Sequence, residues 1–183
     1  MFCGYELLND LNASERSGRI ERLVNMAILE SKDDMRPEDD PKDFSEYLMS
    51  KLPEYFEKVI VPVMKDAEEI YPEYAFSFYV ADEERADFVS RFSGFLENAK
   101  EKTEIGSETI WVNGKADLVV RKKDGSIKVY DYKSDAMNGK PADEFVAAMK
   151  KKYEGQLALY EYAIGKAFEV SNVDTELIDL YRF

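Results

Sequence analysis

Two β-branched runs separated by a short turn constrain the fold of this chain more than any other feature. One run ends the segment of residues 108–121, the other lies in residues 127–132, and the dipeptide Asp124-Gly125 stands between them. An Asp-Gly dipeptide between two strand-forming runs is a strong signal for a β-hairpin. In a three-residue loop that starts at Lys123, Gly125 takes the left-handed conformation, which glycine adopts without steric cost. The sequence therefore predicts two antiparallel strands joined by this loop.

The predicted register places two aspartates side by side. If Lys122 faces Ser126, then Asp117 falls directly opposite Asp131, and Lys133 projects from the same face as Asp131. Directly opposed side chains have Cβ atoms about 4.5–5.5 Å apart, so both carboxylates could share one hard divalent cation. Without a cation, each carboxylate raises the pKa of the other. A two-residue loop would put the aspartates on opposite faces, and two solvated strand acids remain the alternative.

A long amphipathic helix is predicted over residues 141–168, with Pro141 near its first turn. Apolar residues recur there at spacings of three and four. The members of this stripe are Phe145, Met149, Tyr153, Leu157, Tyr160, Ile164 and Phe168. Gln156 lies on or beside the stripe, so it needs hydrogen-bond partners, which an active-site carboxylate, the backbone or a nucleic acid could supply. The alternative is a glutamine at the edge of the core that reaches solvent, with the tyrosines packed in the core.

The rest of the chain predicts helices first and strands later. Apolar periodicity predicts helices over residues 16–29, 44–52, 55–70 and 81–100, with an acidic loop at residues 31–43. We expect Pro53 to separate two of these helices and Pro62 to kink one. Residues 73–80 are predicted to be the first strand of the sheet. These elements predict one α/β domain over residues 1–183, with a mixed central sheet flanked by helices and a helical N-terminal part at residues 1–72.

The charge distribution bears on the class of partner. A net charge of −13 opposes binding to nucleic acid, because phosphate contacts dominate such affinity. Most of the acidic excess lies in residues 1–100, outside the segment with the two aspartates. The basic groups of the second half that form runs or lie near the predicted aspartate pair are Lys115, Arg121, Lys122, Lys123, Lys133, Lys140, Lys150, Lys151 and Lys152. We expect weak binding to DNA by the chain alone, although solvated turn and helix faces also explain the two lysine runs.

Several classes of protein are disfavoured. Cys3 is the single cysteine, so the chain forms no internal disulfide, which fits a reducing cytosol. One cysteine also excludes a four-cysteine iron–sulfur cluster. We expect a cytoplasmic protein that neither spans a membrane nor is secreted, because apolar runs are short and no signal-peptide pattern opens the chain. No phosphate-binding loop of a motor ATPase occurs.

Three motifs resemble one known family. The segments Gly114-Lys115-Ala116-Asp117, Asp131-Tyr132-Lys133-Ser134-Asp135 and Tyr153-Glu154-Gly155-Gln156-Leu157-Ala158-Leu159-Tyr160 resemble the G-x-x-D, D-Y-K-[ST]-D and Y-x-x-Q-L-x-x-Y motifs of RecB-type nucleases. These are the PD-(D/E)XK domains that end RecB and AddA helicase–nuclease proteins. The order and spacing of the motifs also match, and the resemblance covers roughly residues 105–183. Residues 176–183 resemble the strand that follows the glutamine-bearing helix in that family, which makes them the expected last strand. It implies a restriction-endonuclease-like sheet with the catalytic core in residues 73–183.

The resemblance implies a role for each matched residue. Asp117 and Asp131 would be metal ligands, joined by the backbone carbonyl of Tyr132. Lys133 would orient the attacking water and stabilise charge that develops on the scissile phosphate. The metal would be Mg²⁺ or Mn²⁺, which polarises the phosphate and activates water.

The two remaining matched residues, Gln156 and Tyr160, would support the site or touch the nucleic acid strand. The implied activity is exonuclease-like hydrolysis of DNA in DNA repair. The implied substrate is a single-stranded end, delivered by a fused or associated helicase. A rival hypothesis is a catalytically inactive nuclease fold that binds a partner subunit or DNA. A purely structural acidic domain would leave the three motifs to chance.

One departure from the family concerns the third ligand, which is often a histidine on an N-terminal helix. This chain has no histidine, and Arg22 occupies that position in residues 17–23, which resemble the family's helix start. Glu21 or Glu30 could replace the histidine, but their spacing places them on opposite faces of a helix, so only one can point toward the sheet. We favour Glu21 because it flanks the apolar face near the start of the helix.

Overall fold

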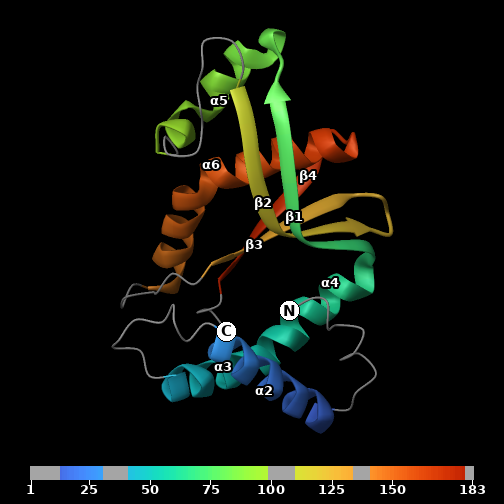
Figure 1. Ribbon diagram of the computed structural model, residues 1–183, viewed down its shortest axis with the longest axis vertical. Coiled ribbons are helices and arrows are strands. Elements are labelled where there is room, and N and C mark those ends of the chain that lie inside the picture. The colour runs from blue at the N-terminus through green and yellow to red at the C-terminus, as the bar shows by residue number, and fades with distance from the viewer. Residues whose placement is uncertain (1–12, 31–40, 99–109, 134–140, 180–183) are drawn as a thin grey trace. The chain divides into compact units, whose positions relative to one another are not determined.

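A computed structural model describes residues 13–30, 41–98, 110–133 and 141–179. These residues fall into two compact units (Figure 1). The first consists of helices and ends at Asp66, and the second, which begins at Ala67, contains the sheet. The predicted boundary at residue 72 lies close to this division, and the single nuclease domain stays a prediction. None of the described helices is long and apolar enough to cross a membrane.

The N-terminal unit contains α2 (Ala13–Glu30), α3 (Pro41–Tyr55), the π-helical turn η3 (Phe56–Ile60) and α4 (Val61–Asp66). The helix predicted over residues 16–29 is confirmed as α2. The predicted break at Pro53 is wrong, because α3 continues through this proline. Leu52, Tyr55 and Phe56 are all buried, and their packing outweighs the hydrogen bond that a proline removes from a helix. The π-helical turn η3 follows directly, and turns of this rare type accompany bends in helices.

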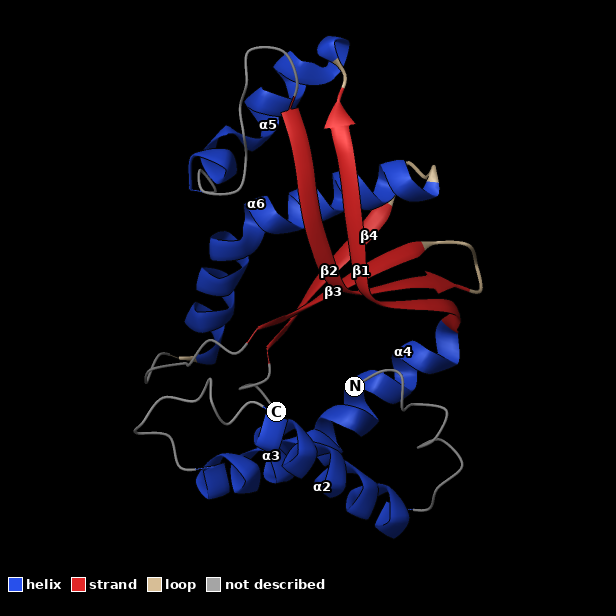
Figure 2. Cartoon of the chain, viewed as in Figure 1, coloured by secondary structure: helices blue, strands red, loops and turns tan. Residues whose placement is uncertain are grey.

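The sheet has the order β1-β2-β3-β4. Its strands are β1 (Ala67–Val80), β2 (Ile110–Lys122), β3 (Ile127–Lys133) and β4 (Val173–Asp179). Neighbours β1–β2 and β2–β3 are antiparallel, whereas β3 and β4 are parallel. The predicted mixed α/β architecture is therefore confirmed (Figure 2). Of the last predicted strand, residues 180–183 lie outside the described residues.

The first strand begins earlier than predicted. The helix expected to continue to Ile70 ends at Asp66, and Ala67 already pairs with Lys122 of β2. Ile70 pairs with Val120, which is fully buried. Because strand preference depends on packing against neighbours more than on local sequence, the β2 partner overrides the helical pattern here.

The β2–β3 hairpin has the predicted register. Gly125 has φ 84°, the Gly125 N–H donates to Lys122 O at 2.9 Å, and the Lys122 N–H donates to Ser126 O at 2.8 Å. Asp124 Oδ1 accepts from the Ser126 N–H at 2.9 Å, which reinforces the turn. Arg121 consequently pairs with Ile127. The three-residue loop is confirmed, and with it the alignment that the aspartate hypothesis needs.

Helix α6 (Ala142–Phe168) connects β3 to the parallel strand β4 and crosses one face of the sheet (Figures 1 and 2). Tyr160 packs edge-to-face on Phe76 of β1, with ring centroids 6.1 Å apart. Gly114 lies beneath the same Phe76 ring, since a Cβ at this position would clash with it. The short helices η4 (Asp82–Glu84) and α5 (Arg85–Asn98) follow β1, which confirms the helical segment predicted there. The long predicted helix is also confirmed, and it carries Gln156 toward the hairpin.

Candidate metal centre

Asp131 is a buried carboxylate at the centre of the site. Its exposed fraction is 1%, and burial raises the pKa of its carboxyl, an effect that the negative charge of Asp117 strengthens. Lys133 opposes this shift, because its Nζ lies 2.6 Å from Asp131 Oδ2. Lys133 therefore projects from the same face as Asp131, as predicted from the alternation of side chains along β3.

Two residues of α6 hold the other oxygen of Asp131. Gln156 Nε2 donates to Tyr160 Oη at 2.7 Å and lies 3.4 Å from Asp131 Oδ1. Tyr160 Oη lies 3.4 Å from the same Oδ1 and donates to the Lys115 carbonyl at 3.1 Å. Burial and the negative charge of Asp131 raise the pKa of the Tyr160 hydroxyl well above its ordinary value, so this group stays a donor. Of the partners considered for Gln156, the structure therefore places an aspartate carboxylate beside it, together with the Tyr160 hydroxyl.

Asp117 lies where the β2–β3 ladder stops. The last pair of the ladder is Leu118–Tyr130, and the next residues in the same register are Asp117 and Asp131. Beyond this pair the side chain of Asp117, and not its backbone, bonds to β3. Its Oδ2 accepts a hydrogen bond from the Tyr132 N–H at 2.7 Å. This bond fixes the Asp117 carboxylate beside the backbone that links Asp131 to Lys133. The two aspartates are therefore neighbours, as the predicted register requires.

Strand β1 is also irregular opposite Asp117. Glu73 has φ 53°, in the left-handed region that residues with a Cβ rarely adopt. The paired positions on either side of this point are Pro72–Leu118 and Tyr74–Ala116. Glu73 and Asp117 are thus left out of the ladder between them. Irregularities of this kind occur often beside active sites, and this one lies in the strand next to Asp117.

Tyr153 supports the ammonium group of Lys133. The Lys133 Nζ lies 4.4 Å from the centroid of the Tyr153 ring, and the Nζ of Lys152 lies 4.9 Å from it. Such cation–π contacts hold a cation over the ring face. The helical periodicity predicted only that Tyr153 packs toward the core. Pattern within one helix does not show which strand residue meets its ring, so the sequence carried no signal for this contact.

The donor atoms near Asp131 suit a hard divalent cation. Two carboxylates and the Tyr132 carbonyl would offer oxygen atoms, the ligand type that Mg²⁺ and Mn²⁺ prefer. A cation there would also offset the cost of a buried carboxylate beside Asp117. Within the described ranges, no three acidic, histidine or cysteine side chains gather closely enough to hold a metal ion. The residues present therefore fit part of a coordination shell.

The third protein ligand stays a prediction. Glu21 is an exposed residue of α2 in the N-terminal unit, and the side chain of Glu30 lies outside the described residues. Arg22, which stands at the position of the family's histidine, donates from Nε to the Gly18 carbonyl at 3.2 Å. This bond within α2 keeps the guanidinium on its own helix.

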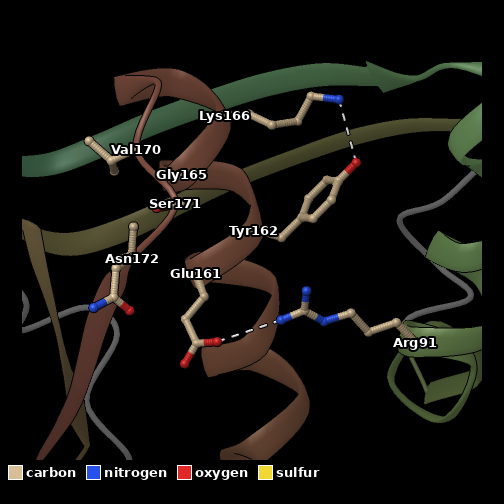
Figure 3. A pocket seen from close by; sticks show the side chains of 9 residues that line it. Arg91, Glu161, Tyr162, Gly165, Lys166, Val170, Ser171 and Asn172 are labelled. Atoms are coloured by element: carbon tan, nitrogen blue, oxygen red, sulfur yellow. Dashed lines mark hydrogen bonds and ion pairs between the residues drawn. The ribbon is translucent and has the colours of Figure 1, made fainter.

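A separate pocket of about 340 Å³ lies between α5 and the turn from α6 to β4 (Figure 3). Its lining residues Arg91 and Glu161 form an ion pair with an N–O distance of 3.6 Å. The lining residue Lys166 forms an ion pair with Glu84 at 2.6 Å. The Lys166 Nζ also donates to Tyr162 Oη at 3.4 Å, as Figure 3 shows. Its cations already have acidic partners, and it shares no residue with the aspartate centre.

Comparison of the sequence with known proteins gives two matches. A sequence model of the PD-(D/E)XK nuclease superfamily matches residues 6–180. The chain is also similar to an ATP-dependent helicase/nuclease protein of Lactobacillus delbrueckii subsp. bulgaricus, with 38% identity over 58 residues. That alignment covers 32% of this chain and 5% of the relative. The chain therefore corresponds to a small part of that relative's length.

Proposed function

Because this chain belongs to the PD-(D/E)XK nuclease superfamily, we propose that it is a Mg²⁺- or Mn²⁺-dependent nuclease that hydrolyses DNA phosphodiester bonds. The observation that carries the proposal is the convergence of Asp117, Asp131 and Lys133 at the open end of one hairpin, with Asp131 only 1% exposed. A buried carboxylate with a raised pKa, a second carboxylate and a cation in one place are typical of catalytic sites.

Each residue has a distinct part in the proposed reaction. The Asp117 and Asp131 carboxylates and the Tyr132 carbonyl would hold the metal, which polarises the phosphate and lowers the pKa of a bound water. Lys133 would orient the attacking water and stabilise the negative charge that develops on the phosphate. Gln156 and Tyr160 orient Asp131 through its Oδ1. Tyr153 keeps the Lys133 ammonium at the site.

The name of the relative extends the proposal to a partner. That protein is part of an ATP-dependent helicase/nuclease, so we propose that this nuclease acts with a fused or associated helicase in DNA repair. An acidic chain with a net charge of −13 binds DNA weakly by itself. A helicase that delivers a single-stranded end would compensate for this weakness, and exonucleolytic cleavage of that end is the activity we propose.

A second candidate is a catalytically inactive nuclease fold that binds a partner subunit or DNA. The observation that favours it is Arg22 at the position of the expected histidine, bound to its own helix backbone. The presence of Asp117, Asp131 and Lys133 in one place argues for an active enzyme. Glu21→Gln and Glu30→Gln separate the choices of third ligand, because only the residue that binds metal should weaken Mn²⁺ binding when changed.

One assay decides between activity and inactivity. Single-stranded DNA is incubated with the chain in Mg²⁺, in Mn²⁺ or in EDTA, and cleavage is compared between wild type and Asp131→Ala. We expect cleavage with either metal, none in EDTA and none with the variant. Cleavage that persists in Asp131→Ala would point to a contaminating nuclease and would remove the proposal's main support.

Metal binding has its own measurement. Mn²⁺ should raise the melting temperature of the wild type, because a ligand that binds only the folded state stabilises it by mass action. Asp117→Asn should blunt this rise without lowering the melting temperature in EDTA. If millimolar Mn²⁺ left the melting temperature of the wild type unchanged and no cleavage occurred, the inactive candidate would be favoured.

A further inference from the structure

Two lysines from different elements place their ammonium groups over one aromatic ring. Lys152, an exposed residue of α6, has its Nζ 4.9 Å from the centroid of the Tyr153 ring. Lys133 of β3 has its Nζ 4.4 Å from the same centroid. Because both distances end at one point, the separation of the two ammonium groups cannot exceed the two distances added together. That separation is shorter than the screening length of about 10 Å in 0.1 M salt, so the two positive charges repel each other.

Lys152 also belongs to the side of α6 that faces Asp131. Lys152, Gln156 and Tyr160 follow one another at intervals of four residues, which places them on one side of the helix. Gln156 and Tyr160 both reach Asp131 Oδ1. Tyr160 is buried, Gln156 is half-buried and Lys152 is exposed. This row of side chains therefore runs from the buried aspartate toward solvent, and Lys152 is its outer member.

We propose that Lys152 binds a phosphate of the substrate strand, next to the phosphate that is cleaved. This inference rests on the proposed function, which places the cleaved phosphate beside Asp131 and Lys133, and it adds the residue that holds the neighbouring phosphate. A phosphate at Lys152 would offset the repulsion between the two ammonium groups at Tyr153. Every nucleotide of a strand carries one negative phosphate, so a strand that presents one phosphate to Lys133 brings another close to Lys152. Such contacts position a strand without reading its sequence.

Helical geometry separates Lys152 from its neighbour Lys151. Around α6, Lys152 is about 40° from Gln156, whereas Lys151 is about 140° from it. Lys151 therefore lies away from the row of side chains that faces Asp131, although both lysines are exposed. Replacing either lysine by glutamine removes one positive charge and changes helix propensity equally. Lys151→Gln is thus the matched control for Lys152→Gln.

Binding of a labelled oligothymidylate, measured by fluorescence anisotropy in EDTA at several salt concentrations, is the direct test. Lys152→Gln should weaken binding about twofold to fivefold at low salt, the effect of losing one exposed ion pair. The slope of log K against log salt concentration should become shallower by about 0.7, the value for one phosphate contact to a single strand. Lys151→Gln should bind like wild type, and Lys152→Arg should keep most of the affinity because it keeps the charge. An equal loss in both glutamine variants would overturn the inference, because it would show a general effect of net charge.

An abasic oligonucleotide of the same length separates contacts to phosphates from contacts to bases. It keeps the phosphates, so Lys152→Gln should weaken its binding by the same factor as for the oligothymidylate. A loss confined to the oligothymidylate would place the Lys152 side chain at the bases and would overturn the phosphate contact.

The position along the strand is tested with oligonucleotides that carry one uncharged methylphosphonate linkage. When this linkage lies next to the phosphate that the wild type cleaves in Mn²⁺, Lys152→Gln and wild type should bind equally well, because the contact is already lost. When the linkage lies farther away, the difference between the two proteins should persist. A difference that persists with the uncharged linkage at every position would overturn the inference.

The same proteins separate this inference from the proposed function. With Mn²⁺, Lys152→Gln should raise KM more than it lowers kcat, because Lys152 holds the strand and does not touch the reacting phosphate. If the binding results follow these expectations but the wild type does not cleave, the nuclease proposal fails and the phosphate contact of Lys152 stands. If the wild type cleaves but Lys152→Gln binds as tightly as Lys151→Gln, the phosphate contact alone fails.

Discussion

Strand β2 has two halves that differ in burial and in the chemistry they carry. From Ile110 to Lys115 the side chains alternate, with Ile110 and Val112 buried while Trp111, Asn113 and Lys115 are exposed. From Ala116 to Val120, all residues except Asp117 are buried. The outer half keeps one face in contact with solvent. The inner half places the Asp117 side chain among apolar neighbours.

This difference separates residues that carry the candidate site and its surrounding core from residues that face solvent. Charge in a buried place is strongly affected by its neighbours, so the pKa of Asp131 responds to Lys133, Asp117 and Tyr160 together. Exposed side chains act more independently, since water and salt screen them. Changes in the inner half should therefore alter catalysis or folding, whereas changes of the exposed side chains in the outer half should alter stability little.

The largest expected effect is on the cleavage rate and comes from Lys133, the last residue of β3. Lys133→Ala should reduce cleavage by about 10²–10³-fold, the typical loss when one electrostatic donor to a transition state is removed. Mn²⁺ should still raise the melting temperature of this variant, because Lys133 is not a metal ligand. Single-turnover cleavage rates provide the measurement, and equal rates for variant and wild type would remove Lys133 from the mechanism.

An increase in side-chain volume at Gly114, near the boundary between the two halves of β2, should lower the stability of the fold. Gly114→Ala places a Cβ against the Phe76 ring, which is itself packed on Tyr160. Such overpacking should lower the free energy of unfolding by about 1–3 kcal/mol, measured by urea denaturation. Gly94→Ala is the matched control: an added Cβ there meets nothing within 4 Å, and alanine inside a helix is favoured by about 0.5–1 kcal/mol.

A smaller effect on cleavage is expected from changing Tyr153, whose ring contacts the Lys133 ammonium group. Tyr153→Leu removes the ring beneath the ammonium group, a contact worth about 0.5–1 kcal/mol or somewhat more when partly desolvated. Cleavage should fall about threefold to tenfold, mainly through kcat. Tyr153→Phe keeps the ring and should retain nearly full activity. If the phenylalanine variant were as slow as the leucine variant, the hydroxyl and not the ring face would be the group that matters.

The smallest effect should come from the outer half. Ser77→Ala removes the exposed hydrogen bond to Asn113, and surface changes of this kind usually alter the free energy of unfolding by no more than about 0.5 kcal/mol. The same urea titration applies. A loss as large as that of Gly114→Ala would show that the open face contributes to folding, which contradicts the division between the two halves.

Several parts of the molecule could be predicted because their causes are local. The Asp124-Gly125 turn determines the β2–β3 register within five residues, as the Lys122–Ser126 hydrogen bond confirms. The apolar periodicity of α6 extends over many turns, so its buried face could be predicted from the sequence. These two elements showed that Gln156 needs a hydrogen-bond partner, but they left open whether a carboxylate, the backbone or a nucleic acid supplies it. The identity of the third metal ligand did not follow from either element.

The sequence by itself determined the hairpin register, the long helix and the residue types that suit a metal centre, because each depends on neighbours close along the chain. Only the tertiary structure decided where β1 begins, how α3 passes through Pro53 and that the Asp117 carboxylate accepts from the Tyr132 N–H. It also decided that Asp131 is almost fully buried and that Tyr153 lies beneath Lys133. These features depend on contacts between distant segments, and such contacts outweigh local propensity when they bury apolar surface or place a charge out of water.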